Sequence, residues 1–135
     1  MWFVLLAVAC GAPPEPATHT VATAPAPASK RSDTDIEGLA AAMEKGVKVI
    51  DVRTPEEFAA GHVPGAVNVP LGSFEAKSSD PALAGIDPDV PTYVICQSGG
   101  RSARAADQLA AGGYAAVNVK GGTGAWIAAG KPVEQ

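Results

Sequence analysis

A cysteine placed between a predicted strand and a predicted helix constrains the fold of this chain more than any other feature. The apolar, β-branched run of residues 91–95 begins at a proline and predicts a buried strand. Residues 101–111 are rich in alanine, which favours a helix, and Gly112 and Gly113 can end it. Cys96 therefore lies at the carboxyl end of a strand, where open α/β sheets bind their ligands.

The loop between this strand and helix predicts a reactive thiolate. Its backbone amides can converge on the Cys96 sulfur, and the N-terminus of the following helix adds partial positive charge. Both effects favour the thiolate, which is the nucleophilic form. The alternative is a cysteine that only fills the core, because free cysteine is among the most buried residue types. The glycines that follow the cysteine favour the catalytic interpretation.

Helices and strands also alternate in the first half of the chain. Asp33 or Asp35 can cap a helix that stops at Gly46, and the apolar residues 47–52 predict a strand covered on both faces. A Thr-Pro-Glu-Glu capping sequence at residues 54–57 predicts the start of a short helix.

The remaining elements complete an alternating pattern. We expect strands at residues 66–69 and 115–119 and a short helix at residues 124–129. We expect a long irregular stretch at residues 71–89, because it contains two prolines. Strands that alternate with helices predict a parallel sheet with right-handed crossovers. We expect only an irregular edge at residues 29–32, because their sequence hardly resembles a strand.

Four stretches resemble the signatures of the rhodanese-like sulfurtransferases, in the order and spacing of that family. They are residues 51–58, residues 61–70, residues 121–126 with their ending at 130–134, and the Cys-x-x-Gly-x-Arg pattern within 96–102. The resemblance extends from residue 31 to the end of the chain. It implies an α/β fold with a parallel five-stranded sheet and helices on both faces.

The resemblance also implies a thiosulfate sulfurtransferase that works by double displacement without a cofactor. Cys96 would take the outer sulfur of a small donor such as thiosulfate or a persulfide, and a thiol acceptor would then remove it. Arg101 would be the second catalytic residue, stabilising the charge of the persulfide or of the leaving group. The backbone of the loop would bind the transferred sulfur through Gln97, Ser98, Gly99, Gly100 and Ser102.

Four further polar residues lie near the same sheet edge. Arg53 follows a strand and is expected to attract an anionic donor. Glu57 is the expected carboxylate partner of Arg101, with a solvated surface charge as the alternative. Asp51 is expected to hydrogen-bond turn backbone rather than do chemistry. His62 is expected to be neutral and bound to turn backbone rather than to act as a general base.

Two other functions remain open. A phosphatase or arsenate reductase of the same fold uses a similar Cys-to-Arg loop, but with one residue more than the four that separate Cys96 from Arg101 here. A sulfur carrier or binding module without turnover of its own would carry the same cysteine.

Composition restricts the partners. The net charge of −4 and the absence of a basic run argue against nucleic acid. No cluster of His, Cys or Asp has the spacing of metal ligands, so we expect no metal. A chain of 135 residues is long enough for one domain with a core of its own, and we expect a monomer.

The N-terminus resembles a bacterial lipoprotein signal. Residues 1–10 contain an apolar run too short to span a bilayer, ending at Cys10, the residue to be acylated. Residues 11–30 are rich in Ala and Pro and predict an extended tether, which leaves 31–135 as the folded domain. We expect a domain anchored by lipid in the bacterial cell envelope and facing the periplasm.

Overall fold

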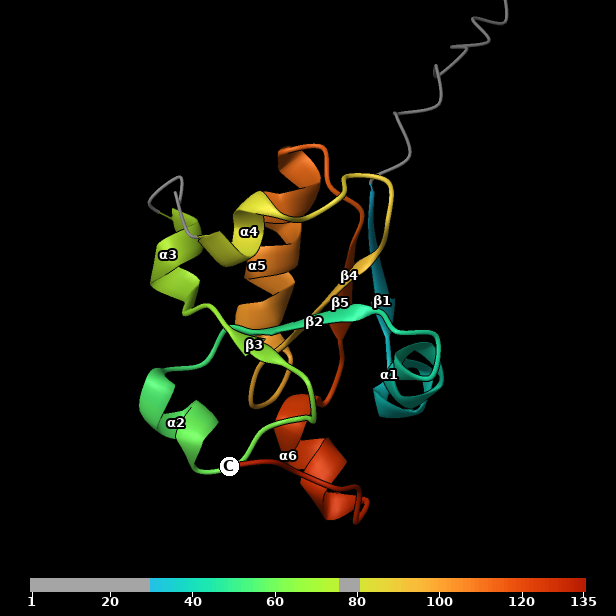
Figure 1. The fold of residues 1–135 in the computed structure, drawn as a ribbon, viewed down its shortest axis with the longest axis vertical. Helices are drawn as coiled ribbons and strands as arrows, with labels where there is room; N and C mark the ends of the chain where they lie inside the picture. The colour runs from blue at the N-terminus through green and yellow to red at the C-terminus, as the bar shows by residue number, and fades with distance from the viewer. Residues whose placement is uncertain (1–29, 76–80) are drawn as a thin grey trace, which may run out of the picture.

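A computed structural model of the chain describes residues 30–75 and 81–135 (Figure 1). The predicted lipoprotein signal and all but the last residue of the predicted tether lie outside the described residues. Within the described part of the chain, no helix is both long and apolar enough to cross a membrane.

All strand pairs of the five-stranded sheet are parallel, and the strand order is β1-β5-β4-β2-β3. The strands are β1 (Arg31–Thr34), β2 (Lys48–Asp51), β3 (Val67–Asn68), β4 (Thr92–Ile95) and β5 (Ala116–Val119). The predicted parallel α/β sheet is therefore confirmed. The predicted cysteine loop follows β4, which is central in the sheet, so the loop lies at the middle of the carboxyl edge.

Two helix starts follow from local capping. The helices are α1 (Ile36–Met43), α2 (Pro55–Ala59), α3 (Leu71–Glu75), α4 (Pro81–Ala84), α5 (Gly100–Ala111) and α6 (Gly122–Ala128). Of the two candidate caps for α1, Asp35 is the one used, and its carboxylate accepts from the amide of Gly38 at 2.8 Å. Thr54 and Glu57 form the predicted capping box at the start of α2.

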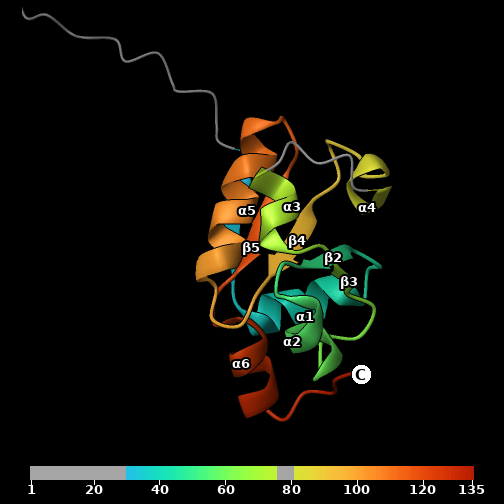
Figure 2. The ribbon, with the colours of Figure 1, turned by 90° about the vertical axis from the view of Figure 1, so that its left-hand side faces the viewer.

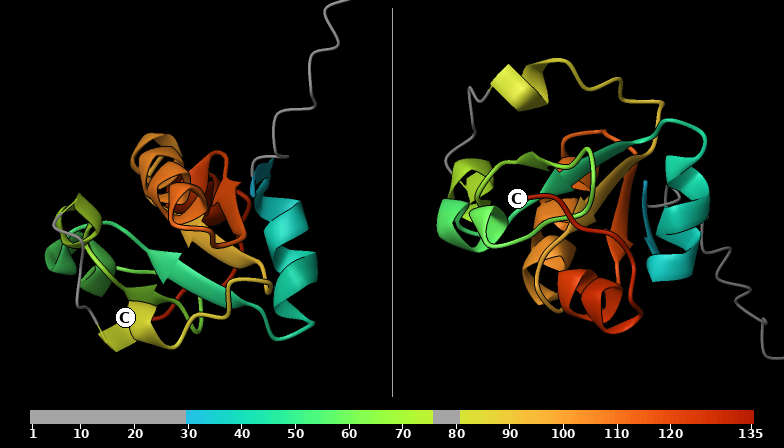
Figure 3. Two further views of the ribbon diagram at one scale, coloured as in Figure 1. Left: turned by 90° about the horizontal axis from the view of Figure 1, so that it is seen from above. Right: turned by 60° about the horizontal axis from the view of Figure 1, so that its bottom comes forward.

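The sheet is covered on both faces by apolar clusters. Side chains of α5 pack with Ile50 and Val94 on one face, and α3 lies beside α5 there (Figure 2). On the other face, Leu39 of α1 and Trp126 of α6 pack with Ile95. Figure 3 shows the sheet between α5 and α1. Because successive strand residues point to opposite faces, the apolar runs of β2 and β4 supply both clusters.

Two expectations about local structure were wrong. The first strand is regular: Arg31 to Thr34 pair in register with Ala116 to Val119 of β5, although their own sequence is polar. An edge strand exposes one side to solvent, so its residues need not be apolar, and hydrogen bonding to β5 determines its conformation. The stretch 71–89 is not irregular throughout, because it contains the short helices α3 and α4.

Candidate functional site

The Cys96 sulfur lies within a set of hydrogen-bond donors at the end of β4. The residue is fully buried, and Sγ accepts from the amide of Gly99 at 3.0 Å and lies 3.3 Å from the hydroxyl oxygen of Ser102. Burial raises the pKa of the thiol, but hydrogen bonds from the Ser102 hydroxyl and from the amides of Ser102, Ser98 and Gly99 outweigh it, so the pKa is lowered. The site therefore favours the nucleophilic thiolate.

The loop reaches this conformation through Gly99. Its φ of 102° lies in the left-handed region, which a residue with a side chain rarely adopts, and it directly precedes the first turn of α5. The turn directs the amide of Gly99 back towards Sγ.

The start of α6 holds the other side of the loop. The amides of Thr123 and Gly124 donate to the carbonyl oxygens of Cys96 and Gln97 at 2.8 and 3.0 Å. A Cβ at Gly122 would collide with the Cys96 carbonyl oxygen, so only glycine allows this approach. These two hydrogen bonds fix the backbone of Cys96 and Gln97 against the start of α6.

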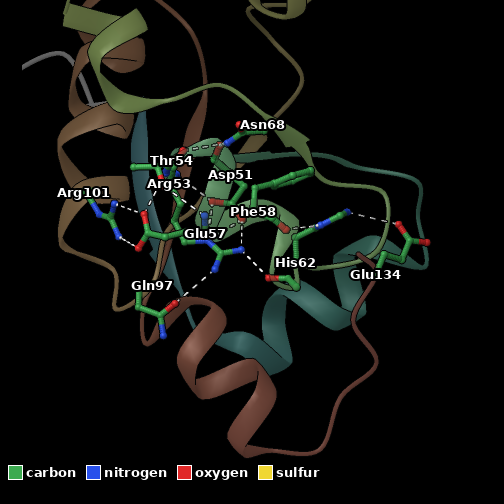
Figure 4. Close-up of polar contacts among 11 residues, drawn as sticks. Asp51, Arg53, Thr54, Glu57, Phe58, His62, Asn68, Gln97, Arg101 and Glu134 are labelled. Atoms are coloured by element: carbon green, nitrogen blue, oxygen red, sulfur yellow. Dashed lines mark hydrogen bonds and ion pairs between the residues drawn. The ribbon is translucent and has the colours of Figure 1, made fainter.

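The structure brings Arg101 and Glu57 together. Two nitrogens of the guanidinium donate to the two carboxylate oxygens, each at 2.8 Å, and both side chains are 36% exposed (Figure 4). The hydrogen bond from Arg101, aided by the Thr54 amide, lowers the pKa of Glu57 to about 2, and the same pairing raises the pKa of Arg101. This pair joins α2 to the first turn of α5 at the exit of the loop.

Arg53 lies in the protein interior. Its Nε donates to both oxygens of Asp51 at 3.0 Å, and its Nη2 donates to Asp51 and to the Gly61 carbonyl at 2.8 Å. Nη1 lies 3.4 Å from Oε1 of Gln97 (Figure 4). Asp51 also accepts from the backbone amide of Arg53 at 3.0 Å, as expected of a turn carboxylate. Arg53 therefore supports the loop through Gln97, and its contact with an anionic donor stays a prediction.

The His62 side chain contacts α2 and the C-terminal segment. Its Nδ1 donates to the Phe58 carbonyl at 2.9 Å, the ring stacks on Phe58, and Nε2 lies 3.8 Å from the carboxylate of Glu134. These contacts agree with the expected backbone-bound histidine. Among residues 30–75 and 81–135, no three His, Cys, Asp or Glu side chains gather into a metal site.

Sequence reasoning missed Asn118, a buried residue of β5. Its Oδ1 lies 2.6 Å from the Ser102 hydroxyl oxygen, and its Nδ2 donates to Asp33 of β1 at 2.9 Å. One signal was available, since Asn118 is the only polar residue of an otherwise apolar strand. Burying an amide is costly unless it is hydrogen-bonded, so such a residue predicts a specific partner.

Together these features define an α/β domain in which a buried cysteine is held by the loop after the central strand. The profile of the rhodanese-like domain family matches residues 35–129, and the chain belongs to that family. Over 97 residues it is 38% identical to thiosulfate sulfurtransferase 16, chloroplastic, of Arabidopsis thaliana, a match that covers 66% of this chain and 81% of the relative.

Two other similar proteins span different shares of this chain. Over 80 residues, the chain is 40% identical to the uncharacterized protein YqhL of Bacillus subtilis, covering 58% of this chain and 60% of that protein. The crystal structure of a rhodanese-related protein from Thermoplasma volcanium superposes with a TM-score of 0.66 at 31% identity, covering 76% of this chain and 97% of the other.

Proposed function

We propose that this protein is a sulfurtransferase that carries sulfane sulfur on Cys96. The donors that surround the Cys96 sulfur are the observation that carries the proposal: the Gly99 amide at 3.0 Å and the Ser102 hydroxyl at 3.3 Å. The loop amides would also stabilise the negative charge of one further sulfur atom bound to Cys96. The similarity to a thiosulfate sulfurtransferase of Arabidopsis thaliana supports the same chemistry.

The proposed reaction has two displacements. The Cys96 thiolate attacks the outer sulfur of thiosulfate, the S–S bond breaks, and sulfite leaves with the bonding electron pair. The resulting persulfide keeps one sulfur on Cys96. A thiolate or cyanide then attacks that outer sulfur, and Cys96 leaves as a thiolate, ready for the next cycle.

Arg101 is proposed to stabilise the anionic donor or the departing sulfite. Its side chain is 36% exposed, so a ligand from solvent can reach it, while Glu57 fixes its position. The loop amides would bind the sulfur, and the guanidinium would bind oxygens further out.

Persulfide formation tests the proposal directly. Purified wild-type protein incubated with thiosulfate should gain one sulfur atom on the Cys96 peptide by mass spectrometry, and cyanide should remove it as thiocyanate over many turnovers. Cys96→Ser should abolish both, because a hydroxyl is barely ionised at neutral pH. Sulfur transfer that persists in Cys96→Ser would contradict the mechanism, and transfer limited to one sulfur per protein would indicate a carrier.

The length of the cysteine loop distinguishes the proposed sulfurtransferase from the phosphatase alternative. Four residues stand between Cys96 and Arg101, and a phosphoryl group needs room for three oxygens around the attacked atom. We expect no measurable hydrolysis of an aryl phosphate by the wild type. Inserting one residue between Gly99 and Gly100 should weaken sulfur transfer. Aryl phosphatase activity in the wild type that disappears in Cys96→Ser would favour the alternative.

We also propose that the domain is anchored by lipid outside the cytoplasmic membrane. The support is in the sequence alone: an apolar run before Cys10 and an Ala- and Pro-rich stretch after it. Cell fractionation should find the wild type in membranes, with Cys10→Ala no longer acylated. Wild type and Cys10→Ala both soluble in the cytoplasm would contradict the anchor.

A further inference from the structure

The Ser102 hydroxyl has one proton and three nearby acceptors. Its oxygen lies 3.3 Å from Cys96 Sγ, 3.1 Å from the Gly99 carbonyl oxygen and 2.6 Å from Asn118 Oδ1. Ser102 is fully buried, so water does not compete for the proton. The three acceptors must therefore compete for it, and the shortest contact is the one to Asn118.

Asp33 decides which end of the Asn118 amide faces Ser102. The carboxylate of Asp33 lies 2.9 Å from Nδ2 of Asn118, and an ionised carboxylate can only accept. The reverse orientation would place two acceptor oxygens against each other. The hydrogen bond from Asn118 also lowers the pKa of Asp33, which keeps it ionised. Asn118 Oδ1 is thus fixed towards Ser102 and can only accept its proton.

We propose that Asn118, oriented by Asp33, is a positioning residue that competes with the Cys96 sulfur for the Ser102 proton. With a neutral thiol, Ser102 donates to Asn118, and the Cys96 S–H donates to the Ser102 oxygen. When the thiol proton is lost to water, the Ser102 proton turns to the thiolate. When Sγ becomes the inner sulfur of a persulfide, the proton returns to Asn118.

This arrangement would limit how readily the resting thiol ionises. Stabilising the thiolate requires the Ser102 proton to leave its short contact with Asn118, so part of that hydrogen-bond energy is lost on ionisation. A thiol that ionises less readily is less exposed to oxidation and alkylation between turnovers.

Other charged groups near the sulfur must stay constant in the test. They are Arg101 of α5 with Glu57 of α2, the Asp51–Arg53 pair after β2, and Asp33 with Arg31 of β1, which Lys120 also approaches. Asn118→Leu removes the hydrogen bond that Asp33 accepts, but it removes none of these charged side chains and keeps a side chain of similar size. The part of any change in Cys96 ionisation that requires Ser102 would then come from the hydrogen-bond competition.

The experiment measures the rate of alkylation of the Cys96 peptide by iodoacetamide as a function of pH, in the full-length chain. Asn118→Leu should accelerate alkylation roughly threefold to tenfold at a pH below the wild-type midpoint, because Ser102 can then donate to the thiolate. Ser102→Ala should slow alkylation. Combining Asn118→Leu with Ser102→Ala should give the rate of Ser102→Ala alone.

An alkylation rate of Asn118→Leu equal to or below the wild-type rate would overturn the proposal, as would an acceleration that persists in the Ser102→Ala background.

If Asn118→Leu does not fold, Asp33→Asn tests the same competition at a half-exposed side chain, because an amide at position 33 no longer fixes the orientation of Asn118. Asp33→Asn should accelerate alkylation only when Ser102 is present. Asp107→Asn, which neutralises the other carboxylate bound to Arg31, should not. Equal rates in Asp33→Asn and Asp107→Asn would contradict the proposal.

The inference rests on the proposed role of Cys96 as the nucleophile. Alkylation reports ionisation without any sulfur transfer, so the two can fail separately. A chain that shows the alkylation pattern but transfers no sulfur would retain the inference and lose the proposed function.

Discussion

Two arginine–carboxylate pairs support the same loop but differ in their burial. The Arg53–Asp51 pair is buried, with side chains 4% and 0% exposed, whereas both side chains of the Arg101–Glu57 pair are 36% exposed. The buried guanidinium has its nitrogens on protein acceptors, and the half-exposed one can be reached from solvent. The comparison favours a structural role for Arg53 and is consistent with the ligand-binding role proposed for Arg101.

The two pairs nevertheless connect one segment to both ends of the cysteine loop. Arg53 contacts Gln97, just after Cys96, and Glu57 holds Arg101, near the end of the loop (Figure 4). The segment 53–57 therefore lies along the loop and restrains it at two points. Loss of the buried pair should affect the whole fold, and loss of the exposed pair should affect mainly the site.

The largest effect is expected from the buried pair. Asp51→Ala leaves the Arg53 charge buried without its carboxylate, which should lower the free energy of unfolding by about 3–5 kcal/mol. Urea denaturation of the full chain measures it. Asp89→Ala, which removes an exposed partner of Lys30, is the control and should leave the urea midpoint unchanged. Equal urea midpoints for Asp51→Ala and Asp89→Ala would show that the buried pair does not stabilise the fold.

A smaller effect, on activity rather than stability, is expected at the exposed pair. Arg101→Ala should reduce thiosulfate:cyanide transfer roughly tenfold to a hundredfold, since a charged hydrogen bond contributes about 1.5–3 kcal/mol. The urea midpoint should stay near that of the wild type. Arg104→Ala, an exposed arginine on the same helix, is the matched control. Turnover of Arg101→Ala within twofold of the wild type would remove Arg101 from the site.

The smallest effect concerns pH. The folded-state pKa of Glu57 is depressed to about 2 from 4.5, so its pairing contributes stability above pH 4.5 that is lost as the pH falls towards 2. Because both side chains are 36% exposed, this contribution should be less than about 1 kcal/mol. Urea denaturation at about pH 6 and pH 3 should show a larger loss of stability for the wild type than for Glu57→Gln. An identical loss in both would show that the pair contributes nothing to stability.

Local patterns in the sequence were sufficient to predict the central unit and the helix caps. The strand before Cys96, the loop and α5 were predictable because an apolar β-branched run, glycines and an alanine-rich segment each favour one conformation by themselves. The Thr54 capping box was predictable for the same reason, since all of its groups lie within one turn.

Only the tertiary structure determined the features that depend on residues distant in the sequence. β1 is a strand because β5 pairs with it, and its polar residues carry no period-two pattern of their own. The burial of Arg53 depends on Gln97 and Gly61, and the role of Asn118 depends on Asp33, 85 residues away, and on Ser102. Residue types alone thus predicted the candidate nucleophile and its loop. Which arginine is buried, and which residue competes for the Ser102 proton, followed only from the packing of the strands beside β4.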